Sequence, residues 1–109
     1  MSRLSELEVM LDHNPDDPFI IYALAREYEQ NLATMQALLM YEHLVTEHPN
    51  YIGTYYHYAK LLYAARNEKE GTRMLERGIE WGIKEKDMHA VSEMKGLLAL
   101  WSQENEETD

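Results

Sequence analysis

Residues 15–49 read PDDPFIIYALAREYEQNLATMQALLMYEHLVTEHP, a stretch that begins and ends on a proline. The 34 residues that follow Pro49 repeat its pattern of apolar and small positions. A period of this length is typical of a helix–turn–helix unit that cannot bury its apolar face alone and stacks on further units. The sequence therefore predicts an all-helical repeat architecture.

Apolar side chains recur at helical spacing in both periods. The first period has a stripe at i, i+3, i+4 and i+7, made of Ile21, Leu24, Ala25 and Tyr28. The second has the same stripe 34 residues later, made of Tyr55, Tyr58, Ala59 and Leu62. Such spacing places the side chains on one face of a helix. No segment carries the alternation of a β-strand that outweighs this period.

The helices outside the two periods are expected to cap the stack, because two repeats are fewer than the roughly three that a stable stack needs. We expect one domain over residues 1–109. It divides into a capping helix (2–12), two repeats (16–49 and 50–83), a C-terminal capping helix (86–103) and a frayed acidic tail (104–109). Gly82 is expected to end the last repeat helix. Ser2 and Asp87 are candidate N-caps.

Residues at key positions of the period match a known pattern. The first period reads Ile21-x2-Leu24-Ala25-x2-Tyr28, then Ala37-x3-Tyr41, then Pro49. The second reads Tyr55-x2-Tyr58-Ala59-x2-Leu62, then Gly71-x3-Leu75, with Ile83 in place of the proline. On these residues the chain resembles the tetratricopeptide-repeat family over residues 16–83, as a small two-repeat protein of bacterial type. The resemblance implies a right-handed superhelical stack of helical hairpins with about six helices.

Small residues explain how each hairpin closes. Ala25 and Ala37 in the first repeat, and Ala59 and Gly71 in the second, are expected to let paired helices approach closely. Tyr28 and Tyr41 would fill the space beside the first pair.

Composition narrows the class of partner. Ten positive side chains stand against twenty negative ones, a balance that repels nucleic acids and anionic membranes. There is no cysteine, no continuous apolar span and no apolar leader. We expect a cytoplasmic protein that binds neither nucleic acid nor membrane. Residues 1–54 hold two cations and nine acids, whereas residues 55–103 hold eight cations and seven acids.

The resemblance implies that the first helix of each hairpin lines a concave groove for a peptide or a partner segment. The candidate binding residues on these helices are Phe19, Tyr22, Arg26, Gln30, Tyr56, His57, Lys60 and Tyr63. Arg26 and Lys60 occupy equivalent positions and would suit an acidic side chain or a C-terminal carboxylate. The tyrosines are typical of interfaces.

Other interpretations of the same residues stay open. Arg26 and Lys60 could form surface ion pairs with Glu27, Glu29 or other acids, and the tyrosines could be partly buried packing. A structural role is the alternative function. In that case the last helix, with Leu100 and Trp101, would form a homodimer.

No pattern for chemistry stands out. His43 and Glu47 share a helix face, but His48 is rotated away and no third ligand follows from the spacing. No glycine-rich phosphate loop follows a strand. We therefore expect no cofactor, no metal and no catalytic residue. The predicted function is a non-catalytic protein-interaction module or adaptor, with an enzyme or metal protein as a remote alternative.

Overall fold

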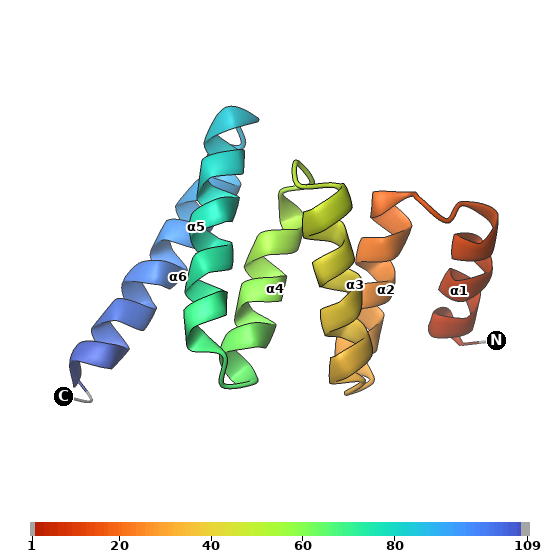
Figure 1. Cartoon of the computed structure of the whole chain (residues 1–109), viewed down its shortest axis with the longest axis horizontal. Helices are drawn as coiled ribbons and strands as arrows, with labels where there is room; N and C mark the ends of the chain where they lie inside the picture. Colours follow the sequence, from red (N-terminus) through yellow and green to blue (C-terminus); the bar gives the residue numbers. More distant parts are fainter. Residues whose placement is uncertain (1, 108–109) are drawn as a thin grey trace. The chain divides into compact units, whose positions relative to one another are not determined.

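The computed structural model describes residues 2–107, and all regular structure in that range is helical. Figure 1 labels the helices in chain order, which are α1 (Arg3–His13), α2 (Pro18–Gln30), α3 (Thr34–Glu47), α4 (Gly53–Ala64), α5 (Glu68–Lys84) and α6 (Met88–Glu107). These six helices of the described chain confirm the predicted all-α class and helical-repeat stack.

Three of the helices have a polar side chain that caps the N-terminus. The Ser2 hydroxyl accepts a hydrogen bond from the Ser5 backbone N–H, and the Asp87 carboxylate accepts one from the Ala90 N–H. Both caps were predicted. The Asp17 carboxylate caps α2 in the same way, ahead of Pro18 in the first turn. Each cap pairs a backbone donor that has no partner inside its own helix.

One turn geometry occurs three times, after α2, α4 and α5. Its residues with left-handed φ angles near 60° are Leu32, Arg66 and Lys86. In each turn the following N–H donates to a carbonyl five residues back, at 2.8 Å. This is the Schellman helix end, in which glycine normally supplies the left-handed residue.

The chain divides into two compact units between Thr54 and Tyr55, a boundary that lies inside α4. The division into one domain with two repeats and two caps stays a prediction.

In the first unit, α2 packs on α3, and α1 packs on α2. Ala25 and Ala37 are fully buried, as are the larger Tyr41 and Leu44. The small alanines therefore lie where the two helices of the hairpin meet.

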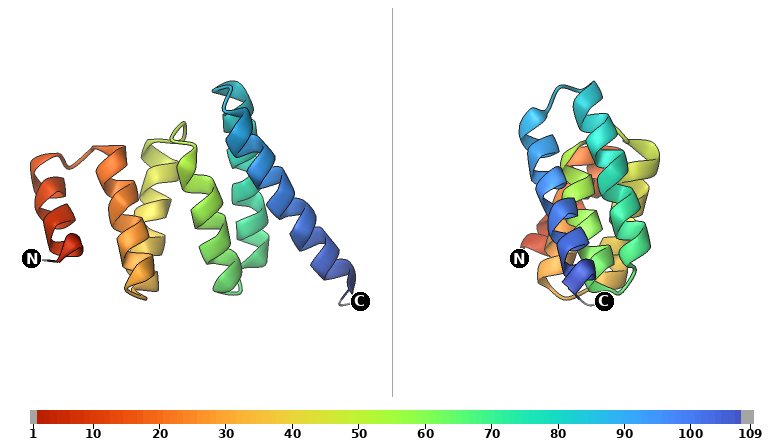
Figure 2. Two further views of the ribbon diagram at one scale, coloured as in Figure 1. Left: turned by 180° about the vertical axis from the view of Figure 1, so that it is seen from behind. Right: turned by 90° about the vertical axis from the view of Figure 1, so that its left-hand side faces the viewer.

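In the second unit, α5 packs on both α4 and α6 (Figure 2). A Cβ atom on Gly71 would lie 3.0 Å from the Ala59 carbonyl oxygen, so this glycine allows the predicted close approach. Gly78 and Gly82 are buried in the same helix. Their missing side chains make room for Tyr55 on α4 and for Val91 on α6.

Three sequence-based expectations are corrected here. Gly82 does not end α5, which continues to Lys84, because Gly82 packs against Val91 and the turn forms around Lys86 instead. The C-terminal helix does not end at residue 103, because α6 extends through Glu107; residues 108 and 109 lie outside the described range, and the fraying of the tail stays a prediction. Trp101 is only 5% exposed, so it packs within the second unit rather than on a free dimer surface.

Candidate binding surface

Four of the candidate binding residues come together on α2. Phe19, Tyr22, Arg26 and Gln30, which we call the α2 surface, line a hollow of about 320 Å³. Their spacing of three or four residues places them on one helix face. Arg3 of α1 lines the same hollow, together with Ala23 and Glu27.

The two aromatic residues of the α2 surface differ in exposure. Phe19 is 61% exposed, although it is a large hydrophobic side chain. Tyr22 is half-buried, and its ring is tilted by 49° against Tyr51 with the ring centroids 5.6 Å apart. Partial burial raises the pKa of the Tyr22 hydroxyl. The nearby positive charge of Arg26 opposes this rise. Of these two aromatic side chains, Phe19 is therefore the more available to a ligand.

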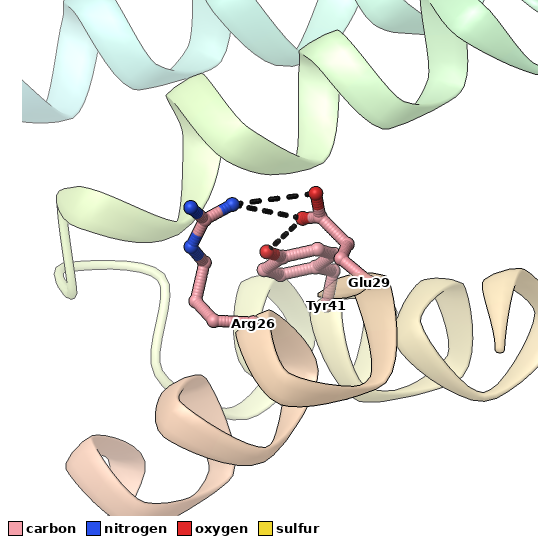
Figure 3. A network of polar contacts seen from close by, with 3 residues as sticks. All are labelled: Arg26, Glu29 and Tyr41. Carbon is pink, nitrogen blue, oxygen red and sulfur yellow. Dashed lines mark hydrogen bonds and ion pairs between the residues drawn. The ribbon is translucent and has the colours of Figure 1, made fainter. Parts of the chain in front are cut away.

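Arg26 belongs to a network of three side chains (Figure 3). Its Nη1 atom lies 3.3 Å from each carboxylate oxygen of Glu29. The hydroxyl of Tyr41, a buried residue of α3, donates a hydrogen bond to the same carboxylate. Glu29 thus links the exposed face of α2 to the inside of the hairpin.

The network shifts the pKa values of Arg26 and Tyr41. Burial alone would lower the pKa of the Arg26 guanidinium, but its interactions with Tyr41 and Glu29 outweigh burial and raise it. Burial also raises the pKa of Tyr41, and the hydrogen bond to Glu29 adds to this rise. Arg26 therefore forms an ion pair with Glu29 of the same chain, which is one of the interpretations that the sequence left open.

Arg3 provides a second guanidinium at the hollow. Its Nε atom lies 3.8 Å from Glu27, and its side chain is 64% exposed. This contact is longer than a normal hydrogen bond. Arg3 and Arg26 are the two cations of residues 1–54, so the structure places both of them at one hollow.

On α4, three candidate residues lie together in the second unit. The Nζ atom of Lys60 stands 5.3 Å from the centre of the Tyr56 ring, which is within the range of a cation–π contact. The ring of His57 meets Tyr56 edge-on, with centroids 5.4 Å apart. Tyr56 and His57 are half-buried, whereas Lys60 is exposed.

Tyr63, the fourth candidate on α4, is engaged by α6. Its ring stacks on Trp101, with centroids 4.2 Å apart and planes 12° from parallel. Its hydroxyl donates a 3.0 Å hydrogen bond to Glu104, which raises the pKa of Tyr63. Four of the candidate residues thus lie on α2 in the first unit, and four lie on α4 in the second unit, where Tyr63 is partly covered.

Two solved structures of a tetratricopeptide repeat domain protein from Salinibacter ruber resemble this chain. The alignment with its solution structure has 34% sequence identity and a TM-score of 0.75, and it covers 78% of this chain and 86% of the Salinibacter chain. The alignment with its crystal structure has 33% sequence identity and a TM-score of 0.74, and it covers 77% of this chain and 93% of the Salinibacter chain. The chain belongs to the tetratricopeptide repeat family.

A third structure agrees with this tetratricopeptide repeat fold. A protein from Bordetella parapertussis is 19% identical, covers 96% of this chain and 91% of that one, and has a TM-score of 0.82. At this identity the similarity shows the fold alone. No protein-family sequence model matches the chain, and no curated protein matches it.

The tetratricopeptide repeat pattern did not reveal every residue of the candidate surface. Arg3 was missed because it lies outside the two matched periods, and the link from Glu29 to Tyr41 was missed because Tyr41 was assigned only to packing. One feature of the sequence could have indicated Arg3. Arg3 and Arg26 are the two Arg or Lys residues of the acidic segment 1–54.

No group of three or more histidine, aspartate or glutamate side chains among residues 2–107 could hold a metal ion. None of the helices in the described range is both long enough and apolar enough to cross a membrane.

Proposed function

We propose that this chain is a non-catalytic interaction module that binds a segment of a partner protein on the α2 surface. Tetratricopeptide repeats are helical scaffolds that present extended surfaces to other proteins. The observation that carries the proposal is the hollow on the first unit, which gathers an exposed phenylalanine, a half-buried tyrosine and two guanidinium groups. The concave groove and the cytoplasmic location remain predictions from the sequence.

The side chains at the hollow suggest what the partner segment carries. An apolar or aromatic side chain would cover Phe19, which otherwise exposes most of its surface to water. An acidic side chain or a C-terminal carboxylate would meet Arg3 before Arg26, because Arg3 holds its acid at 3.8 Å and Arg26 holds Glu29 with two contacts at 3.3 Å. Tyr56, His57, Lys60 and Tyr63 on α4 are a second candidate contact.

A matched pair of variants tests this function. Phe19→Asp adds a charge to the α2 surface, and Leu39→Asp adds the same charge on α3 at a side chain of similar exposure, 57% against 61%. Each purified variant would capture partners from cell lysate, with circular dichroism as the check on folding. We expect Leu39→Asp to retain the wild-type partners and Phe19→Asp to lose them. Equal capture by all three proteins would exclude the α2 surface.

A further inference from the structure

One face of α6 is left exposed in the second unit. Met88 and Leu100, the exposed large hydrophobic residues of this helix, are 58% and 50% exposed. Ser92 and Gly96 stand between them at intervals of four residues, and both are exposed. Residues four apart lie along one side of a helix, so the four form a row that is large at both ends and small in the middle.

Nothing among residues 2–107 accounts for Gly96 in this row. The buried glycines of α5 each meet a neighbour, with their ideal Cβ positions 2.5–3.0 Å from another residue. A Cβ atom on Gly96 would meet nothing within 4 Å. Glycine inside a helix costs about 0.5–1 kcal/mol relative to alanine. A helix that crosses α6 closely at Gly96 would account for it, because the distance between packed helices depends on the side chains at their contact.

Charges flank the row on opposite sides. With about 100° of turn per residue, Glu93 lies roughly 80° to one side of the row and Lys95 roughly 80° to the other. Glu93 also contacts His89 at 3.2 Å on the exposed side of the helix. Residues 88–103 contain this one acid and this one lysine, with no other Asp, Glu, Lys or Arg, although the whole chain has a net charge of −10.

We propose that this face binds the same face of a second copy of the chain, with the two α6 helices crossing at Ser92 and Gly96. In a two-fold pair whose helices run in the same general direction, each edge of one helix meets the opposite edge of the other. Glu93 would then lie beside the partner subunit's Lys95, and the second edge would repeat the pair. Copies that repel elsewhere through their acids would meet over a segment of balanced charge.

The proposed contact replaces the dimer surface expected from the sequence. Leu100 remains part of it, but Trp101 is excluded because it stacks on Tyr63. A single pair of crossing helices buries less than the roughly 1,000 Å² typical of stable interfaces. The association is therefore weak and depends on concentration. It is independent of the α2 surface, which lies in the first unit.

Sedimentation equilibrium over a wide concentration range tests the proposal. We expect the average mass of the full chain to rise from 12.9 kDa toward twice that value. Gly96→Leu fills the middle of the row, and its Cβ atom would meet no other described residue within 4 Å, so it should keep or raise thermal stability and abolish the rise in mass. A wild-type chain that stays monomeric, or a Gly96→Leu chain that still dimerises, would overturn the proposal.

Charge variants test the arrangement of the two copies. Glu93→Lys places lysines on both edges and Lys95→Glu places acids on both, so each variant alone should stay monomeric. An equimolar mixture should restore the dimer, because each edge then pairs a lysine with a glutamate. If the mixture stays monomeric, or if either variant alone dimerises as the wild type does, the same-direction arrangement is wrong.

Discussion

The backbone of Gly78 in α5 lies so close to Tyr55 in α4 that a Cβ atom on the glycine would stand 2.5 Å from the Cβ atom of the tyrosine. The same Cβ would lie 2.6 Å from the sulfur of Met94 in α6. The equivalent position of the first repeat, 34 residues earlier, is Leu44, and the position equivalent to Tyr55 is the smaller Ile21; both are buried. In the second repeat, the large Tyr55 on α4 therefore packs against the small Gly78 on α5.

Gly78→Ala should destabilise the second unit, because the new methyl group has no space between Tyr55 and Met94. Overpacking of this kind costs typically about 1–3 kcal/mol. Gly96→Ala is the matched control on α6, where it should stabilise by about 0.5–1 kcal/mol. Urea unfolding followed by circular dichroism measures both. Equal effects of the two substitutions would contradict the close contact at Gly78.

Leu32 combines a left-handed backbone with an 86% exposed side chain. A left-handed conformation costs a residue other than glycine about 1–2 kcal/mol, part of which the greater freedom of an unfolded glycine offsets. Leu32→Gly should therefore raise the free energy of unfolding by up to about 1 kcal/mol. Leu32→Ala removes the same apolar group but keeps the strain, so it should not stabilise. A loss of stability in the Leu32→Gly variant would show that the left-handed backbone at Leu32 is not strained.

The raised pKa of Tyr41 predicts a dependence of stability on alkaline pH. The folded chain keeps the Tyr41 proton above about pH 10, where an unfolded tyrosine releases it. The group thus leaves stability unchanged below this pH, and stability falls as the pH rises above it. Tyr41→Phe should flatten this fall by up to about 1.4 kcal/mol per pH unit.

The measurement for Tyr41 is urea unfolding of both proteins from neutral pH to about pH 11. At neutral pH the phenylalanine variant also loses the hydrogen bond to Glu29, so it should be less stable by about 1.5–3 kcal/mol. Parallel slopes of the two proteins above pH 10 would mean that Tyr41 does not keep its proton in the folded chain.

The Thr54 side chain is fully buried, and its hydroxyl has no hydrogen-bond partner among the described residues. A buried hydroxyl without a partner costs about 1–3 kcal/mol. Thr54→Val keeps the shape and removes the hydroxyl, so it should raise the melting temperature or leave it unchanged. Thr46→Val is the comparison, since the Thr46 hydroxyl donates to the Glu42 carbonyl at 2.9 Å. Destabilisation by Thr54→Val beyond that of Thr46→Val would reveal an unseen partner.

The sequence by itself determined the helical period and the small residues Ala25 and Ala37 inside the first hairpin. These follow from local geometry, because a residue's place on a helix depends only on its spacing from its neighbours. The same reasoning grouped Phe19 and Arg26 on one face, where the structure also has them.

Only the tertiary structure decided which of these faces meet other elements. It placed Arg3 beside the α2 surface, joined Glu29 to Tyr41, buried Trp101 against Tyr63 and kept Gly82 inside α5. Each of these depends on a contact between residues on different helices, and no helical period encodes such a contact. The reason is physical: spacing sets the direction of a side chain, whereas burial and pairing depend on which helix the chain folds against it.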